Sequence, residues 1–248
     1  MRGRKSFNAT NLTIPHGLLL INKPRGWRSF DIVRYFQRIA QMRKIGHSGT
    51  LDEQATGLMI LGFGRDTTFL SDLLACKKTY IFRMIFGAIS DTLDGAGKQW
   101  SFGSIFRDQI TAEKIKQCIQ KKFLGEVAQV PPIYSCLKQK GKRLHEYARN
   151  QEEVEIEPRK IMIHQFQLIS FVYQGYYPQA ILEVECSSGT YIRSIARDLG
   201  MQLGTHAYLA DLCRTSIGPY HFSKAVSPKT ITSMDQIKAL RISPYKGE

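Results

Sequence analysis

The sequence has no apolar run long enough to cross a membrane. A spanning helix needs about 20 consecutive apolar residues, whereas the longest run here, at residues 58–63, is the length of a strand. The N-terminal segment is basic but contains no apolar stretch of the kind that a secretory signal requires. We therefore expect a cytoplasmic protein that does not bind membranes.

Cysteine and histidine are scarce and scattered. The five cysteines are odd in number and widely spaced, and none pairs with another cysteine or histidine at the spacing of a zinc site. The six histidines form no H-x-x-x-H pair. The sequence therefore predicts reduced cysteines and no metal site.

Three nucleotide and hydrolase motifs are incomplete. Gly97-Lys98 lacks the upstream glycine and the following Ser or Thr of a phosphate-binding loop. The pair Gly62 and Gly64 lacks the third glycine of a dinucleotide fingerprint. The run at residues 46–50, GHSGT, ends in threonine where a nucleophile elbow needs glycine. These gaps argue against an ATPase, a dehydrogenase and an α/β-hydrolase.

Acidic residues are few relative to basic ones. The 35 Lys and Arg exceed the 21 Asp and Glu, which gives a net charge of +14. Most of the excess lies at residues 1–50, with ten basic and one acidic residue, and at 101–150, with ten and four. Segregated positive charge indicates a polyanionic partner, because each neutralised phosphate releases counterions. Charge alone does not distinguish RNA, DNA and an anionic membrane, and a role in solubility is the alternative.

The hydrophobic pattern mixes strands and helices without regular βαβ alternation, which favours an α+β fold. Strands are predicted at residues 17–22, 56–63, 79–87, 161–173 and 180–186. Helices are predicted at residues 29–41, 66–76, 111–123, 144–149 and from 190 to about 203. Ser29 and Asp66 are the expected caps of the first two helices, and residues 42–55 and 90–98 are expected to be loops and turns.

A glycine-rich loop at residues 46–57, GHSGTLDEQATG, places a histidine, hydroxyls and the carboxylates of Asp52 and Glu53 between a basic helix and an apolar strand. Glycines allow such a loop unusual backbone turns. Two interpretations are open. Asp52 is either a carboxylate placed for chemistry or the side chain of an Asx-turn, bonded to nearby amides.

A second polar cluster lies at residues 186–200, CSSGTYIRSIARDLG. It puts Arg193 in the first turn of a helix, although cations are favoured at the opposite end. This position indicates a carboxylate or phosphate partner. The alternative is an ordinary surface arrangement of Arg193 and Arg197 near Asp198.

Taken together, six stretches resemble the TruB family of tRNA pseudouridine synthases. In chain order they are GLLLINKPRG, GHSGTLDEQATGL, KKTYIFRMIFGAISDTLDGAGK, PPIYSCLKQKGKRLHEYAR, CSSGTYIRSIARDLG and AYLADLCRTSIGPY, and they cover about residues 16–220. The resemblance implies isomerisation of uridine 55 in the T-loop of tRNA to pseudouridine, with no cofactor, metal or energy source. It also implies a pseudouridine-synthase-like catalytic domain with a central mixed, mainly antiparallel sheet, flanking helices and a clamp-like insertion.

The resemblance assigns roles to individual residues. Asp52 matches the catalytic aspartate, Arg193 the arginine that pairs with it, and Tyr80 the active-site tyrosine that stacks on the target base. The uridine lies inside a folded loop and has to be flipped out to reach Asp52. Further substrate-binding positions are implied at His47, Tyr191, Leu212, Lys23, Asp94, Lys138, Lys140, Lys142 and Arg143.

The resemblance also divides the chain. We expect a basic arm at residues 1–15 and a catalytic domain at 16–225, with an RNA-clamping insertion at about 126–155. We expect the remaining tail, 226–248, to be too short for the C-terminal RNA-binding domain that many family members carry. A second departure is Glu53, which stands where the family usually has proline. A carboxylate facing Asp52 would raise the pKa of Asp52, so Glu53 is expected to face solvent.

The expected partner is tRNA, bound through its T-arm stem-loop, and a monomer with no protein partner is the simplest arrangement. One alternative within the same chemistry is an RNA-guided, dyskerin-like synthase. An alternative from another class is a non-catalytic RNA-binding protein or tRNA-folding chaperone of the same fold. A structural or membrane-associated protein is a more distant alternative, since the basic residues do not lie on one amphipathic surface helix.

Overall fold

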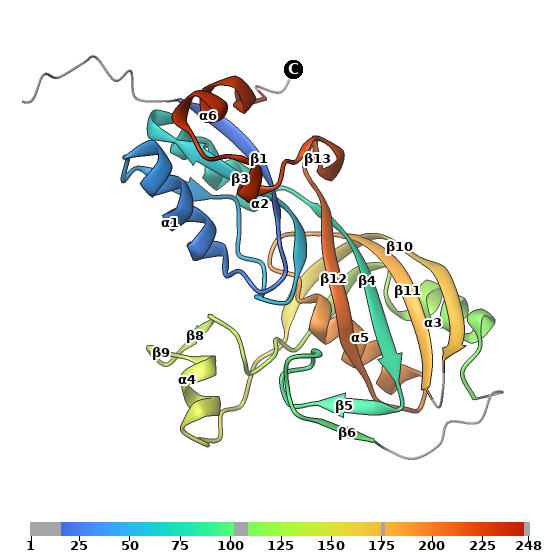
Figure 1. Cartoon of the computed structure of the whole chain (residues 1–248). Coiled ribbons are helices and arrows are strands. Elements are labelled where there is room, and N and C mark those ends of the chain that lie inside the picture. The colour runs from blue at the N-terminus through green and yellow to red at the C-terminus, as the bar shows by residue number, and fades with distance from the viewer. Residues whose placement is uncertain (1–15, 102–108, 175–176, 246–248) are drawn as a thin grey trace, which may run out of the picture.

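The structure is a computed structural model that describes residues 16–101, 109–174 and 177–245. The basic arm expected at residues 1–15 lies outside these ranges. Among the described residues, nine strands form one twisted sheet in the order β1-β3-β12-β4-β11-β10-β7, with β13 added to β12 and β2 to β3 (Figure 1). These strands are β1 (Gly17–Lys23), β2 (Ile45–His47), β3 (Thr56–Phe63), β4 (Lys78–Phe86), β7 (Gly125–Gln129), β10 (Arg159–Gln174), β11 (Tyr177–Cys186), β12 (Ala207–Ile217) and β13 (Tyr220–His221).

The sheet is mixed but almost wholly antiparallel. The contact between β3 and β12 is parallel, with Cys213 opposite Thr56 and Arg214 opposite Gly57. Every other pair of neighbours among the described strands of this sheet is antiparallel. The predicted α+β class with a mixed, mainly antiparallel sheet is confirmed.

Helices cover both faces of the sheet. They are α1 (Ser29–Ala40), α2 (Leu70–Ala75), α3 (Ala112–Lys122), α5 (Ile192–Gln202) and α6 (Met234–Leu240), whereas α4 (Leu144–Arg149) belongs to the insertion. Strand β4 alternates buried and half-buried residues, and its buried side packs with α3 and α5 in one apolar cluster. Strands β1 and β3 are buried on both faces, against α1 and α6 on one side and α2 on the other. Such two-sided burial explains their continuous apolar runs.

Two expected helix caps were wrong. The cap of α1 is Arg28, whose backbone N–H is accepted by the Asp31 carboxylate at 3.1 Å. The hydroxyl of Ser29 instead bonds Leu51, in a distant loop. The helix expected at residues 66–76 is divided into a 3-10 segment, Gly64–Phe69, and α2, so Asp66 lies within the first segment and caps neither.

Further elements differ from the prediction, among them β7 and α6, which were not predicted. The loop expected at 42–55 contains β2, and the helix expected from Thr190 begins at Ile192. Strand β12 was not predicted at all. Register shifts between Leu209 and Asp211 and again between Arg214 and Ser216 interrupt its pairing with β4. Because these bulges break the two-residue period, β12 carries no clear alternating pattern.

The last described residues pack onto the sheet. Leu18 and Ile242 exchange two backbone hydrogen bonds of 2.8 Å, and Ile237 of α6 is fully buried with Ile32 of α1. The described part of the tail therefore packs on the core through Ile231 and Ile237, and its other residues are mostly exposed or half-buried. Among the described ranges, no helix is long and apolar enough to cross a membrane.

The expected insertion begins inside the sheet, because residues 126–129 belong to β7. The chain then leaves the sheet and forms a short hairpin, β8 (Lys138–Gln139) and β9 (Lys142–Arg143), followed by α4. In Figure 1 the hairpin and α4 stand apart from the sheet, below α1 in the view. A second small hairpin, β5 (Ala88–Ser90) with β6 (Gln99–Ser101), encloses the turn at residues 91–98.

Candidate active site

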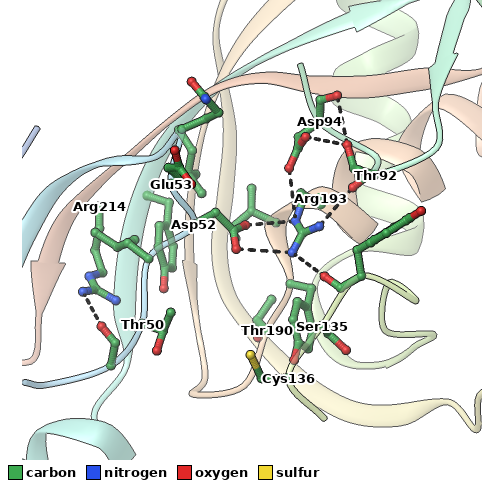
Figure 2. A pocket seen from close by; sticks show the side chains of 18 of the residues that line it. Thr50, Asp52, Glu53, Thr92, Asp94, Ser135, Cys136, Thr190, Arg193 and Arg214 are labelled. Carbon is green, nitrogen blue, oxygen red and sulfur yellow. Dashed lines mark hydrogen bonds and ion pairs between the residues drawn. The ribbon is translucent and has the colours of Figure 1, made fainter. Parts of the chain in front are cut away.

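A cavity of about 830 Å³ lies where the loop after β2 meets β4, β12, the start of α5 and the insertion (Figure 2). Its size is within the range of small-molecule and cofactor sites. Six residues that the sequence analysis assigned to the site lie in its wall: Asp52, Tyr80, Asp94, Tyr191, Arg193 and Leu212. They come from segments up to 160 positions apart, so the fold assembles the cavity.

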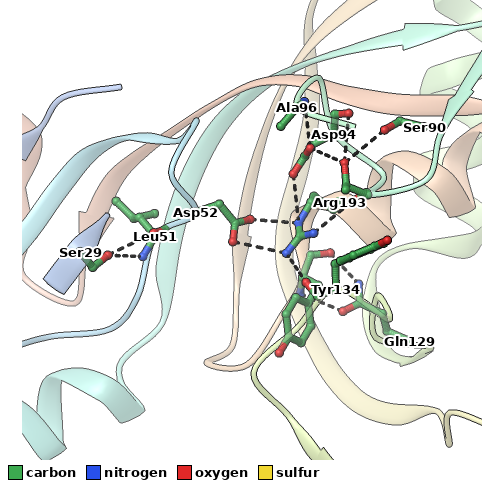
Figure 3. A network of polar contacts seen from close by, with 11 residues as sticks. Ser29, Leu51, Asp52, Ser90, Asp94, Ala96, Gln129, Tyr134 and Arg193 are labelled. Carbon is green, nitrogen blue, oxygen red and sulfur yellow. Dashed lines mark hydrogen bonds and ion pairs between the residues drawn. The ribbon is translucent and has the colours of Figure 1, made fainter. Parts of the chain in front are cut away.

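An ion pair stands in the cavity wall. The Nε of Arg193 lies 2.9 Å from Oδ2 of Asp52, and its Nη2 lies 3.3 Å from Oδ1 (Figure 3). The same guanidinium donates to the carbonyl oxygens of Thr92 at 3.0 Å and Tyr134 at 3.1 Å. The Arg193 side chain is 7% exposed and the Asp52 side chain 44%. A fixed, buried cation therefore orients a carboxylate that remains open to a ligand.

Asp94 supports the pair from behind. Its Oδ2 lies 3.7 Å from Nε of Arg193, too long for a hydrogen bond but close enough for attraction between the charges. Its Oδ1 accepts from the Thr92 hydroxyl at 2.6 Å and from the backbone N–H of Ala96 at 3.0 Å. These bonds fix the turn that presents the Thr92 carbonyl to Arg193. Asp94 is therefore a positioning residue.

Two buried side chains hold the loop on either side of Asp52. The Ser29 hydroxyl accepts from the Leu51 N–H at 2.9 Å and donates to the Leu51 carbonyl at 3.1 Å. The Lys23 ammonium donates to the carbonyls of Glu53 at 3.1 Å and Ala55 at 2.7 Å. Burial lowers the pKa of Lys23 to about 8, although the nearby carboxylates of Asp52 and Glu53 oppose that shift. Lys23 thus acts through the backbone of the loop.

Tyr80 and Arg214 are cross-strand neighbours on β4 and β12, beside the same loop. Arg214 is 1% exposed. Its Nε donates to the Leu58 carbonyl at 2.8 Å and its Nη2 to the Gly49 carbonyl at 3.1 Å. Burial raises the pKa of Tyr80, and the Arg214 charge opposes that rise. Arg214 of β12 therefore lies beside Tyr80 of β4 and is bonded to the start of the loop that carries Asp52.

Glycine at position 57 makes the close parallel contact of β3 with β12 possible. Its φ is +106°, and a Cβ there would lie 2.4 Å from the Arg214 carbonyl oxygen and 2.5 Å from the Arg214 nitrogen. No other residue fits without moving the backbone that carries Arg214.

Of His47 and Tyr191, the structure places only Tyr191 in the cavity wall. The ring of His47 is half-buried, lies outside the cavity wall, and accepts the Gly49 N–H at Nδ1 over 3.2 Å. Burial lowers the pKa of His47. The backbone of Tyr191 exchanges two hydrogen bonds with the side-chain amide of Gln129, at 2.9 and 3.1 Å. These two bonds fix the start of α5 to the end of β7. Arg193, in the cavity wall, follows two residues later.

Residues 37–192 match the family model described as TruB family pseudouridylate synthase, N-terminal domain. The chain belongs to this family. It is 42% identical over 224 residues to "tRNA pseudouridine synthase B" of Protochlamydia amoebophila, an alignment that covers 89% of this chain and 82% of that protein. It is 38% identical over 215 residues to the protein of the same name from Caldanaerobacter subterraneus, covering 87% and 73%.

Two solved structures share the fold of this chain. The chain is 25% identical, with a TM-score of 0.63, to a chain in the crystal structure of a Cbf5-Nop10-Gar1 complex, covering 86% of this chain and 52% of that one. A Nop10-Cbf5 complex of the archaeal box H/ACA sRNP gives 23% identity and a TM-score of 0.64, covering 92% and 58%. This chain therefore spans little more than half of these solved chains, and the likeness concerns the fold.

The four basic residues assigned to the clamp of this TruB family chain lie on the β8–β9 hairpin, outside the cavity wall. Lys138, Lys140 and Arg143 are exposed. Lys142 differs, because its ammonium lies 2.6 Å from both carboxylate oxygens of Glu152 and 4.7 Å above the Tyr147 ring. The hairpin therefore presents three available cations, and Lys142 holds it in shape.

Glu53, which was expected to face solvent, is exposed, and Figure 2 shows it pointing away from the Asp52–Arg193 pair. Within the described residues, no group of three or more His, Cys, Asp and Glu side chains could hold a metal ion. The sequence analysis missed Arg214. The sequence feature that could have indicated it is its position two residues after Leu212, in the stretch AYLADLCRTSIGPY.

Proposed function

We propose that this protein isomerises uridine 55 in the T-loop of tRNA to pseudouridine, with Asp52 as the catalytic carboxylate. The observation that carries the proposal is the Asp52–Arg193 pair, a half-exposed carboxylate held by a buried guanidinium in the wall of a nucleotide-sized cavity. The relatives at 38–42% identity are both named tRNA pseudouridine synthase B. Their names support tRNA as the substrate over guide-directed RNA.

The reaction breaks the N1–C1′ bond of the uridine and joins C1′ to C5 of the same uracil. C5 gives up its proton and N1 takes one, so the product is an isomer and no electrons leave the substrate. A carboxylate suits this chemistry because it can act as a nucleophile or as a base toward the sugar or the ring. Of the carboxylates in the cavity wall, Asp52 is the half-exposed one that is paired with the buried Arg193.

The target base has to leave its stack to reach Asp52. Flipping costs a few kcal/mol, which stacking on an aromatic side chain and contacts to phosphates offset. Tyr80 and Tyr191 are among the aromatic side chains of the cavity wall, and Leu212 supplies apolar contact. We propose that the insertion at about 126–155 closes on the T-arm, with Lys138, Lys140 and Arg143 against phosphates.

We further propose that residues 16–225 form the catalytic unit and that the enzyme acts on tRNA in the cytoplasm as a monomer, without a membrane or protein partner. The test is to incubate unmodified tRNA with the protein and map pseudouridine by position. We expect modification at position 55 and none in a tRNA with cytidine there. Modification elsewhere, or only after adding a guide RNA, would contradict the proposal.

A further inference from the structure

The outer face of α1 carries a stripe of exposed side chains that the active site does not use. Phe30, Arg34 and Arg38 are spaced four residues apart, so they lie along one side of the helix. All three are exposed, and Phe30 is 54% exposed. The opposite side, with Ile32 and Phe36, is buried against β1 and β3. The outer face of α1 is therefore exposed and takes no part in the core.

The arginines of the stripe form no close ion pair among the described residues, although Asp31 attracts Arg34 at longer range. The one carboxylate on α1, Asp31, is taken by Arg28 through bonds of 3.0 and 3.4 Å to the guanidinium. Within the described part of the chain, neither Arg34 nor Arg38 has an acidic partner within ion-pair distance. Two arginines on one helix face, neither held in an ion pair among the described residues, attract a polyanion.

Phe30 and Arg34 are already arranged together. The Arg34 guanidinium carbon lies 4.7 Å from the centre of the Phe30 ring, a cation–π geometry that orders both side chains. A single exposed phenylalanine is ordinary on a protein surface. An aromatic ring joined to arginines that lack acidic partners is, by contrast, the combination that binds nucleic acid by stacking and by phosphate contact.

The stripe begins at the active site. Ser29, directly before Phe30, is the residue whose hydroxyl holds Leu51 next to Asp52. With a rise of about 1.5 Å per residue, Arg34 and Arg38 lie roughly 6 and 12 Å along the helix from Phe30. The stripe therefore leads away from the active-site loop along the surface.

We propose that Phe30, Arg34 and Arg38 form a binding track for the backbone of the RNA strand that enters the active site. Arg34 and Arg38 contact successive phosphates, and Phe30 supports Arg34 and stacks on an unpaired base or ribose. The track is separate from the β8–β9 hairpin, so the RNA is held from two sides. This inference rests on the proposed function, because it concerns how the same substrate is bound.

The test compares the double variant Arg34→Gln/Arg38→Gln with the control Lys116→Gln/Lys121→Gln. The control removes two exposed charges from α3, which lies away from α1. Binding of a T-arm stem-loop is measured over a range of salt concentrations. At about 0.15 M salt we expect the α1 variant to bind about 10- to 30-fold more weakly and its log–log salt slope to fall by about 1.5. The turnover number at saturating RNA and the thermal stability should stay unchanged.

Phe30 is tested by Phe30→Ala and Phe30→Tyr. The alanine variant should weaken binding at least about five-fold, and the tyrosine variant should retain it, because every aromatic ring offers a stacking face. Equal affinity of the α1 and α3 variants for the stem-loop would contradict the proposed binding track. A change in oligomeric state of the α1 variant with unchanged RNA affinity would contradict it too. Failure of the wild-type protein to modify an RNA that it binds would contradict the proposed function and leave the binding comparison intact.

Discussion

Arg193 meets Asp52 edge-on, with Nε 2.9 Å from Oδ2 and Nη2 3.3 Å from Oδ1. The guanidinium is fixed from behind by the carbonyls of Thr92 and Tyr134, whereas the carboxylate is 44% exposed to the cavity. The buried guanidinium thus lies inside the protein, and the exposed carboxylate faces the cavity. The proposed role of Asp52 depends on that asymmetry.

Arg193→Met should lower turnover on the order of 100-fold or more, because Asp52 loses the group that orients it. Two carbonyls also lose their donor, which should reduce the free energy of unfolding by about 1–3 kcal/mol. The matched control is Arg197→Met on the next turn of α5, which contacts Asp198 and the Val130 carbonyl. Single-turnover kinetics and urea unfolding separate the effects. An equal loss of turnover in both variants would contradict the role of Arg193.

Gly57→Ala should destabilise the protein by more than about 3 kcal/mol, because its Cβ would press on the Arg214 backbone at 2.4 Å. Gly204→Ala is the control, since Gly204 also has a positive φ, +73°, but a Cβ there would meet nothing within 4 Å. There only the backbone strain of about 1–2 kcal/mol applies. Urea unfolding of both variants measures the difference, and similar losses would show that the β3–β12 approach is not tight.

Lys23 predicts a pH dependence of stability. Its pKa is about 8 in the folded protein, against 10.5 for an ordinary lysine. The unfolded chain therefore binds the proton more tightly, and the cost of burying the charge is present below pH 8 and relieved as the pH rises toward 10.5. The free energy of unfolding of the wild type should rise relative to Lys23→Met over that interval. If the free energies of unfolding of wild type and Lys23→Met changed in parallel between about pH 7.5 and 10, the claim that the Lys23 ammonium is buried would be contradicted.

The hairpin variants should separate binding from chemistry. Lys138→Gln/Lys140→Gln removes two exposed cations, so the KM for tRNA should rise several-fold and the salt dependence of binding should fall, with kcat little changed. Lys142→Gln should affect phosphate binding less, because Glu152 already takes that ammonium. Steady-state kinetics at two salt concentrations test this ranking. A drop in kcat with constant KM would place the hairpin in the chemical step instead.

Periodicity located most of the fold. The alternation along β4 and the apolar stripe of α1 set those elements to within about two residues, because their burial comes from one regular face. Strand β12 was not predicted, because its bulges interrupt the two-residue alternation of buried side chains. Ser29 looked like a helix cap, but its partner is Leu51, 22 positions away. Local rules do not foresee such a bond.

The site was less accessible to local reasoning than the fold. Asp52 and Arg193 are 141 positions apart, and each had an ordinary local explanation, as an Asx-turn and as a surface arginine. Their pairing was expected only from the resemblance of six ordered stretches to one family. Arg214 was overlooked because a buried arginine bonded to distant backbone carbonyls leaves no local signature.

The most direct test of the central claim is tritium release from a T-arm stem-loop labelled at C5 of its uridines, compared between wild type and Asp52→Asn. The wild type should release the label from one uridine per RNA, whereas Asp52→Asn should release it on the order of 1,000-fold more slowly or not at all, with RNA affinity retained. Release by Asp52→Asn at the wild-type rate, or no release by the wild type, would contradict the assignment of Asp52 as the catalytic carboxylate.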